Sequence, residues 1–237
     1  MSAAPTSLPQ LCGDRPPPGA RHPLWASVDR VRPALAVAVG FGAGAIPFSN
    51  LMARRRVGVD LRSVGTGTVS GTGLSQVAGI GPMVFAGLFE VAKGAVGPAL
   101  AGRRHPLAAA LAGAAAVVGH NWSPWLGGAG GRGISPAMGA LLVSAPAGSL
   151  VLLAGLAAGR LAGETAIGSI VADAVLVPVA GRAHGRRGGR AATLVLVPMV
   201  AKRLVGNRRP VAPGASVYLV RLLLDRDTWA KAEGASP

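Results

Sequence analysis

Long apolar stretches separated by short polar segments make up most of this 237-residue chain. A stretch of about 20 apolar residues is long enough to cross the hydrocarbon core of a bilayer as a helix. The apolar stretches cover 33–53, 77–101, 106–122, most of 134–180, and 191–205. This pattern predicts an all-α, polytopic transmembrane bundle of about five to seven helices.

Two kinds of break leave the number of spans open. The stretch 134–180 is interrupted at Ala145–Pro146 and again at 160–164, which indicates about two or three helices. The polar segment 182–190 contains four arginines and predicts a loop. A count of about seven spans would put this loop outside the cell, against the positive-inside rule, whereas fewer full spans would remove the conflict.

The ends of the chain differ in composition from its middle. Residues 1–32 are rich in proline and arginine and predict a disordered tail. Residues 33–206 form the expected transmembrane domain. Residues 207–237 are expected to be a second tail, with an amphipathic helix over 216–230 that lies on the membrane surface.

The charge supports a membrane protein rather than a nucleic-acid-binding protein. Charged residues make up 14% of the chain, the mean hydropathy is +0.46 and the net charge is +15. The basic residues lie in short clusters between apolar stretches, where they suit anionic headgroups. We therefore predict a multi-pass protein of the cell inner membrane that contacts membrane lipids and binds no nucleic acid. A single cysteine, Cys12, excludes an internal disulfide, and no motif indicates a metal or cofactor.

The segment 57–76 combines glycines with hydroxyl side chains. Gly65 and Gly67 alternate with Thr66 and Thr68, and Arg62 precedes them. Glycine lets consecutive backbone amides point into one concavity, which is a natural anion site, and the hydroxyl groups add donors. The alternative interpretation is a flexible, solvated loop in a glycine-rich protein.

A second glycine-rich segment, 123–133, follows His120. Its glycines surround a fixed positive charge, Arg132, which is again a composition suited to phosphate. His120 closes an apolar stretch, where an isolated histidine is commonly an interfacial hydrogen-bonding residue. The glycines nearest to Arg132 are Gly130, Gly131 and Gly133.

Two ionisable residues, Glu90 and Lys93, interrupt the apolar stretch 77–101. They are one helical turn apart, so they can pair on one face of a helix. Ionisable groups at membrane depth are costly and commonly functional. The alternative is a structural pair near a helix end, and the sequence does not decide between them.

Four segments, taken in order, resemble a known family, the bacterial membrane acyl-phosphate:glycerol-3-phosphate acyltransferases. FGAGAIPFSN (41–50) resembles the family's first helix, and 58–79 resembles its first glycine motif. LFEVAKGAV (88–96) is similar to the family's acidic residue followed by K-G. VVGHNWSPWLGGAGGRGIS (117–135) is similar to its second motif. The resemblance extends over about 41–209, with agreement in order, spacing and apolar context.

The resemblance implies transfer of an acyl group from acyl phosphate to glycerol 3-phosphate, giving lysophosphatidic acid and phosphate in phospholipid synthesis. It also implies that no cofactor is needed. Thr66 matches the first-motif serine, Arg132 the second-motif lysine and His120 the second-motif histidine, so these are the expected catalytic residues. The expected substrate-binding residues are Arg62, Gly65, Gly67, Thr68, Lys93, Gly130, Gly131 and Gly133.

The chain departs from the family's pattern at several donors. Thr68 and Gly73 stand where the family has asparagine, Gln76 where it has arginine, and Ala129 where it has lysine; of the third motif only 202–206 is similar. Two alternatives therefore stay open. One is a non-catalytic relative that binds a phospholipid or a phosphorylated metabolite, and the other is a small transporter with Glu90 and Lys93 in its path.

Overall fold

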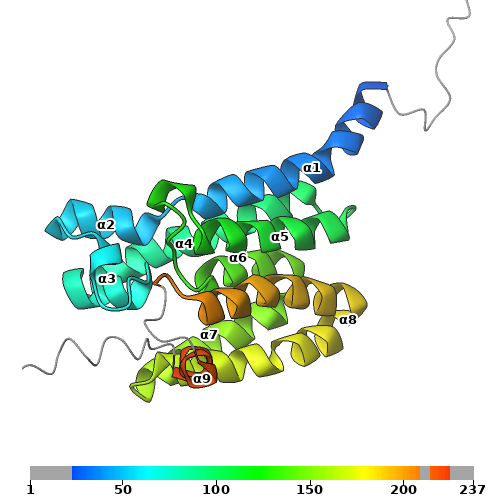
Figure 1. Cartoon of the computed structure of the whole chain (residues 1–237). Helices are drawn as coiled ribbons and strands as arrows, with labels where there is room; N and C mark the ends of the chain where they lie inside the picture. Colours follow the sequence, from blue (N-terminus) through cyan, green and yellow to red (C-terminus); the bar gives the residue numbers. More distant parts are fainter. Residues whose placement is uncertain (1–22, 209–213, 225–237) are drawn as a thin grey trace, which may run out of the picture. The chain divides into compact units, whose positions relative to one another are not determined.

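The computed structural model describes residues 23–208 and 214–224, and every regular element within them is a helix (Figure 1). Three of these helical segments, Val31–Val57, Ile80–Ala101 and Thr165–Val205, are long and apolar enough to cross a membrane. The predicted all-α membrane class is thus confirmed. The elements are α1 (Pro23–Ala45), α2 (Phe48–Val57), the 3₁₀ turn η1 (Leu61–Ser63), α3 (Gly71–Ala78), α4 (Ile80–Ala101), α5 (Pro106–Asn121), the 3₁₀ turn η2 (Pro124–Leu126), α6 (Ile134–Ser144), α7 (Pro146–Leu161), α8 (Thr165–Val205) and α9 (Ala215–Leu224).

Helix α1 begins at Pro23, ahead of the predicted apolar stretch, so residues 23–32 are helical rather than part of a disordered tail. Proline suits the first position of a helix because the amide that it lacks would have no helical partner there. Residues 1–22 of the predicted tail lie outside the described residues. The chain forms two compact units, and the second begins at Arg32 and contains every feature described below.

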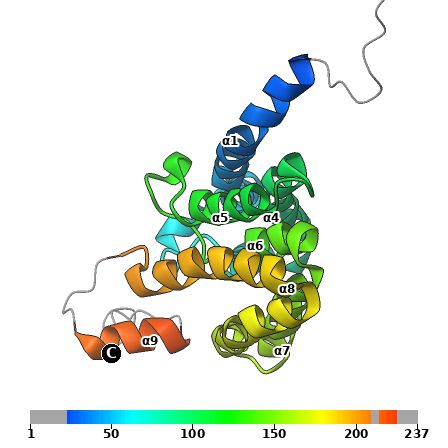
Figure 2. The same cartoon turned by 90° about the vertical axis from the view of Figure 1, so that its right-hand side faces the viewer.

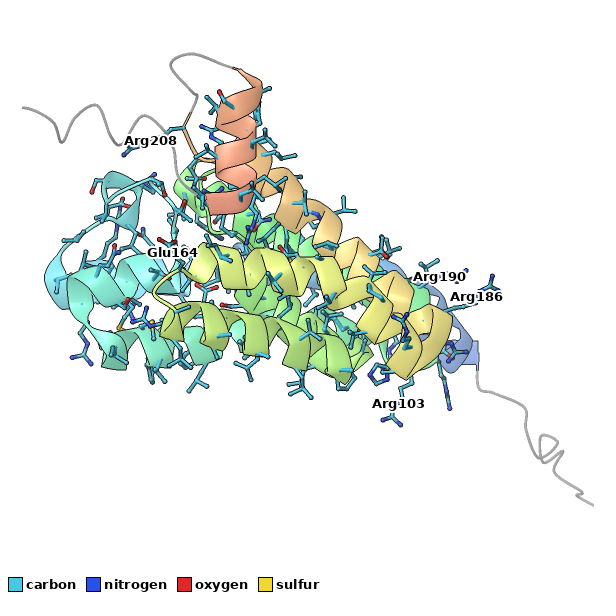
Figure 3. All side chains as sticks on the ribbon, turned by 90° about the horizontal axis from the view of Figure 1, so that it is seen from below. Arg103, Glu164, Arg186, Arg190 and Arg208 are labelled. Carbon is cyan, nitrogen blue, oxygen red and sulfur yellow. The ribbon has the colours of Figure 1, made fainter. Side chains whose placement is uncertain are left out.

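Helices of the second unit run back and forth between two ends of a bundle. At one end lie α2, α3 and the two glycine-rich segments, and we call it the loop end. At the other end Arg32 donates to the Leu100 carbonyl (2.7 Å), and the Ala147 amide donates to His184 (3.1 Å). Figure 3 shows Arg103, Arg186 and Arg190 gathered at this second end, away from Arg208. We call it the arginine end.

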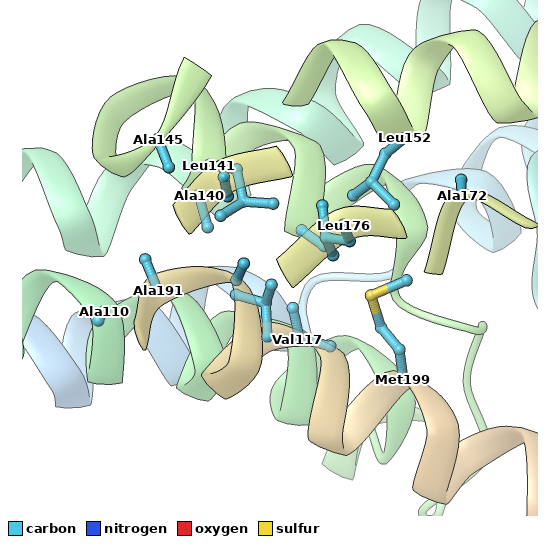
Figure 4. Close-up of a cluster of buried hydrophobic side chains, with 14 residues drawn as sticks. Ala110, Val117, Ala140, Leu141, Ala145, Leu152, Ala172, Leu176, Ala191 and Met199 are labelled. Carbon is cyan, nitrogen blue, oxygen red and sulfur yellow. The ribbon is translucent and has the colours of Figure 1, made fainter. Parts of the chain in front are cut away.

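Small residues let the helix backbones approach closely, as expected of helices packed in lipid. A Cβ atom at Gly139 of α6 would lie 1.8 Å from the Val91 carbonyl of α4, and one at Gly94 would lie 2.0 Å from the Pro136 carbonyl. Figure 4 shows the main apolar core, in which alanines alternate with larger side chains such as Leu176 and Met199. These contacts join α5, α6, α7 and α8 around one core.

The prediction of a loop at 182–190 is wrong, because helix α8 runs through this segment. Gly185 has φ +64° and ψ −160°, and helix continues on both sides of it. A Cβ at Gly188 would lie 2.5 Å from the Ala180 carbonyl, so the two halves fold back on each other (Figure 2). The segment is a tight helical hairpin whose four arginines are exposed. Glycine suits the reversal because it adopts a positive φ at no steric cost.

Helix α9 begins where an amphipathic helix was predicted, but its arginine does not face headgroups. Arg221 is buried and donates to the carbonyls of Leu204 (3.2 Å), Val205 (2.8 Å) and Arg208 (2.7 Å). A cation there satisfies the free carbonyls at the end of α8. Leu219 and Leu223 are exposed, so contact with the membrane surface stays a prediction for this apolar face; residues 225–237 lie outside the described part.

The close approach of α4 and α6 gives a matched test on one helix. Gly94→Ala should lower the free energy of unfolding by about 1–3 kcal/mol, because its methyl group would overlap the Pro136 backbone. Gly87, two turns earlier, has no atom within 4 Å of its hypothetical Cβ, so Gly87→Ala should leave stability unchanged or slightly raised. Thermal unfolding in detergent compares the two, and equal melting temperatures would contradict this packing.

Candidate functional site

The predicted loop 57–76 is shorter than expected because α3 forms within it. Ser70 caps α3, its hydroxyl accepting a hydrogen bond from the Gly73 amide (3.1 Å). Serine is a favoured N-cap, and the capping pattern outweighs the glycines that suggested a loop. The irregular part that remains, 58–70, is called loop A here. It starts at Gly58, which has φ +71° and ends α2.

The second glycine-rich segment, 123–133, is irregular apart from the turn η2, as predicted; together with Trp122 it is called loop B. Its glycines permit close backbone approach: a Cβ at Gly130 would lie 2.1 Å from the His120 carbonyl. A Cβ at Gly131 would lie 2.2 Å from His120 Nε2 and 2.6 Å from the Val69 carbonyl. No other residue type fits at these two positions without moving the backbone or the imidazole.

Loops A and B contact each other directly at the loop end of the bundle. The Val69 amide of loop A donates to the Gly130 carbonyl of loop B (3.1 Å). The Arg62 side chain donates to the Leu126 carbonyl (3.3 Å). Two segments that are more than 50 residues apart in sequence therefore form one surface. The two glycine segments therefore converge at the loop end of the bundle.

Asn207, just beyond α8, joins both loops to a third segment. Its side-chain nitrogen donates to the carbonyls of Gly67 (3.1 Å) and Gly130 (2.9 Å), and its oxygen accepts from the Gly130 amide (3.2 Å). Sequence reasoning missed this residue. The only signal was its place directly after 202–206, the remnant of the third family motif.

A buried ionic cluster lies beneath the loops. Lys93 Nζ is 2.6 Å from Glu90 Oε2, which confirms the predicted pairing one helical turn apart. His120 Nδ1 is 3.1 Å from the same oxygen. Glu90 Oε1 accepts from the amide (3.0 Å) and the hydroxyl (3.2 Å) of Ser49 at the start of α2. The cluster thus connects α4, α5 and α2.

Lys93 is buried against three protein groups. Besides its ion pair with Glu90, its ammonium group donates to the Ile46 carbonyl (2.6 Å) and lies 3.1 Å from His120 Nδ1. His120 Nδ1 can either donate to Glu90 or accept from Lys93, but a single ring nitrogen cannot do both. His120 is similarly enclosed, because Nδ1 faces Glu90 and Lys93 while Nε2 lies against Gly131.

Arg132 belongs to loop B and is buried, with 7% of its surface exposed. One of its terminal nitrogens donates to the Lys202 carbonyl on the last turn of α8 (2.9 Å). Lys202 is also buried, and its ammonium lies 5.1 Å from the centre of the Trp122 ring. The arrangement places two cations next to each other under the glycine loops. Sequence reasoning found Arg132 and missed Lys202, because an isolated lysine near a helix end has no distinctive spacing.

The hydroxyl groups expected in the site lie in loop A. Thr66 and Thr68 are half-buried and hydrogen-bonded to each other through their Oγ1 atoms (2.9 Å). Gly67 between them is the residue held by Asn207. Gly65 adopts φ +52° but is exposed, with no atom within 4 Å of a hypothetical Cβ. It shapes the turn without contacting loop B.

Asp60 holds Arg62 at the entrance to loop A. Hydrogen bonds from Arg62 and Arg54 keep the pKa of the Asp60 carboxyl well below its usual value. The same pairing raises the pKa of Arg62. Asp60 is therefore ionised at any physiological pH and cannot act as a proton donor. It orients Arg62, whose guanidinium remains exposed on the surface of the loop.

Comparisons with known proteins agree on one family. A family model described as glycerol-3-phosphate acyltransferase matches residues 34–209. The chain is 34% identical over 210 residues to glycerol-3-phosphate acyltransferase 5 of Dehalococcoides mccartyi, covering 81% of this chain and 88% of the relative. It is 38% identical over 161 residues to the Myxococcus xanthus glycerol-3-phosphate acyltransferase, covering 61% and 83%.

Two solved structures share the fold. They are crystal structures of PlsY (YgiH), an integral membrane glycerol 3-phosphate acyltransferase, in its glycerol 3-phosphate and lysophosphatidic acid forms. The TM-scores are 0.66 and 0.64, with 23% and 21% identity. The alignments cover 72% of this chain and 88% or 87% of the solved chains.

Removal of the Asn207 amide should loosen loop B. Asn207→Ala deletes three hydrogen bonds that join the loops, each of which stabilises by about 0.5–1.5 kcal/mol. We expect faster trypsin cleavage after Arg132, measured by mass spectrometry of the protein in detergent. Asn207→Asp keeps the acceptor for the Gly130 amide but loses both donors, so it should be intermediate.

Cleavage after Arg190, at the arginine end, serves as an internal control and should not change. If Asn207→Ala and the wild type are cut after Arg132 at the same rate, Asn207 does not hold the loops together.

Proposed function

The chain belongs to the glycerol-3-phosphate acyltransferase family, and we propose that it transfers an acyl group from acyl phosphate to the first hydroxyl of glycerol 3-phosphate. The hydroxyl oxygen forms an ester bond to the acyl carbon, and the bond from that carbon to the phosphate oxygen breaks. The hydroxyl proton passes to the phosphate that leaves, and the products are lysophosphatidic acid and inorganic phosphate. The observation that carries this proposal is the convergence of two glycine loops and Arg132 in one place.

Both substrates carry phosphate, and the site offers the groups that bind phosphate. Backbone amides in loops A and B are the expected donors. The amides of Gly67, Gly130 and Gly131 now donate to the Val64 carbonyl (2.9 Å), the Asn207 side chain (3.2 Å) and the His120 carbonyl (3.3 Å), so each would exchange that partner for a phosphate oxygen. Arg132 supplies the positive charge. Thr66 and Thr68 supply hydroxyl groups, provided that one of them exchanges its present partner for a phosphate oxygen.

The reaction requires little of the protein beyond orientation of the two substrates. Acyl phosphate already carries a good leaving group, so no nucleophile on the enzyme is required. Holding the two substrates in line and stabilising the developing negative charge supply the rate enhancement. Arg132 and the loop amides suit the second task, and Thr66 and Arg62 suit the first.

His120 and Lys93 are better explained as positioning residues than as groups that touch substrate. Each is enclosed by protein partners, and together they hold the Glu90 carboxylate and the start of loop B. The transporter alternative needs an accessible charge in a path. Glu90 and Lys93 are buried against each other and against other protein groups, so they offer no support for it. We infer that His120→Ala would act through displacement of Gly131.

We also propose the orientation of the protein as a multi-pass component of the cell inner membrane. Large apolar side chains such as Phe85 and Leu88 are exposed on α4, as expected of a surface that faces lipid. The loop end would face the cytoplasm, where a soluble phosphorylated substrate is available. The arginine end would then lie on the other side, so this orientation rests on access of the substrate and runs against the positive-inside rule for the arginines of 182–190.

An assay on the full chain in nanodiscs tests the activity. Phosphate release from acyl phosphate should require glycerol 3-phosphate and should match the amount of lysophosphatidic acid formed. Arg132→Ala should reduce the rate about 10²-fold or more, as expected for loss of a charge-stabilising donor. Arg132→Lys should retain part of it, because the charge remains while the guanidinium geometry is lost.

Arg186→Ala removes one exposed charge at the arginine end and should leave the rate unchanged. Phosphate release that is absent from the wild type, or independent of glycerol 3-phosphate, would instead favour a non-catalytic relative that binds a phosphorylated metabolite.

A further inference from the structure

Lys202 is a buried cation that has no anionic partner within residues 23–208 and 214–224. Only 1% of its surface is exposed, and within those residues its ammonium group lies over the face of Trp122, 5.1 Å from the ring centre. Over the same residues, the ion pairs of the carboxylates involve other cations. Burial of an ammonium group without a counter-ion is unfavourable, so the group is poised to accept an anion.

Arg203, the residue after Lys202, is a cation with a structural role in this helix. Arg203 donates to the Ser169 hydroxyl and to the Leu222 carbonyl (3.0 Å) and lies 3.8 Å from Asp173. Its donors are used to join the two halves of α8 and to hold α9. Lys202, one residue earlier and equally buried, has no comparable set of partners.

Arg132 adds a second positive charge at the same place. It donates to the Lys202 carbonyl, and the two cations lie within electrostatic range of each other. Like charges repel strongly where little water screens them. An anion bound between the two cations would be attracted by both and would offset their mutual repulsion.

We propose that Lys202 is a second phosphate-binding residue, which acts with Arg132 to hold the phosphate group of one of the two substrates. This inference rests on the proposed acyl transfer and adds a residue to it. A phosphate dianion matches two cations in charge, whereas Arg132 alone leaves half of that charge unbalanced. The ligand is a phosphate monoester or an acyl phosphate, and kinetics can tell which.

The alternative role is structural: the ammonium group packs on Trp122 and only fills space. Lys202→Met separates the two, because methionine keeps most of the volume and the contact with the ring but not the charge. Lys202→Arg keeps the charge with a different shape. Arg190→Met is the matched control, since it removes one charge from the same helix at the arginine end.

The experiment measures phosphate release by the full chain in nanodiscs while each substrate is varied at saturating levels of the other. Lys202→Met should raise KM about tenfold or more for one substrate, and Lys202→Arg should restore part of it. A rise for glycerol 3-phosphate assigns Lys202 to the acceptor, and a rise for acyl phosphate assigns it to the donor. Arg190→Met should match the wild type.

Stabilisation against heat by glycerol 3-phosphate and, separately, by inorganic phosphate gives a readout that needs no turnover. If the wild type releases no phosphate but either ion stabilises it, and Lys202→Met abolishes that shift, the acyl transfer fails and this inference stands. The inference is overturned if both KM values stay within about twofold of the wild type. It is also overturned if Lys202→Met and Lys202→Arg lose activity and stability equally, or if neither ion stabilises the wild type.

Discussion

The ionic cluster of Glu90, Lys93 and His120 is the constraint on which the loop end depends. Charges inside an apolar bundle are tolerated only when they are paired and hydrogen-bonded, and removal of one partner of a buried pair typically costs about 3–5 kcal/mol. Here a single carboxylate is held by Lys93, His120 and Ser49. Because these partners come from different helices, the cluster joins α2, α4 and α5 at one point.

The cluster constrains the position of the loops through His120. The imidazole ring lies against Gly131, and the His120 carbonyl accepts from the Gly131 amide (3.3 Å), so the path of loop B is set by the end of α5. Loop B then fixes loop A through Val69 and, with the help of Asn207, fixes the end of α8. A glycine-rich site that would otherwise be flexible is thereby preorganised, which is what catalysis by orientation and charge requires.

Local features of this protein could be predicted from sequence, and long-range ones could not. Apolar stretches identified the membrane class, spacing identified the Glu90–Lys93 pair, and glycine composition with Arg132 identified the two loops. The hairpin at Gly185 was read as a loop because its arginines outweigh a single glycine that reverses the helix. Asn207 and Lys202 were missed because their partners lie about 70 or more positions away, and no local pattern encodes such a contact. The burial of Arg221 could not be predicted, because amphipathicity does not reveal the free carbonyls that end α8.

We infer that loop A, loop B and the end of α8 form one phosphate site rather than three independent segments. Hydrogen–deuterium exchange of the full chain in nanodiscs, with and without saturating glycerol 3-phosphate, tests this directly. We expect backbone amides in 65–70, 128–133 and 206–208 to become protected together, at the same ligand concentration, while 185–190 at the arginine end exchanges as before. Protection confined to one of the three segments, or protection that appears at different concentrations in each, would contradict a single site.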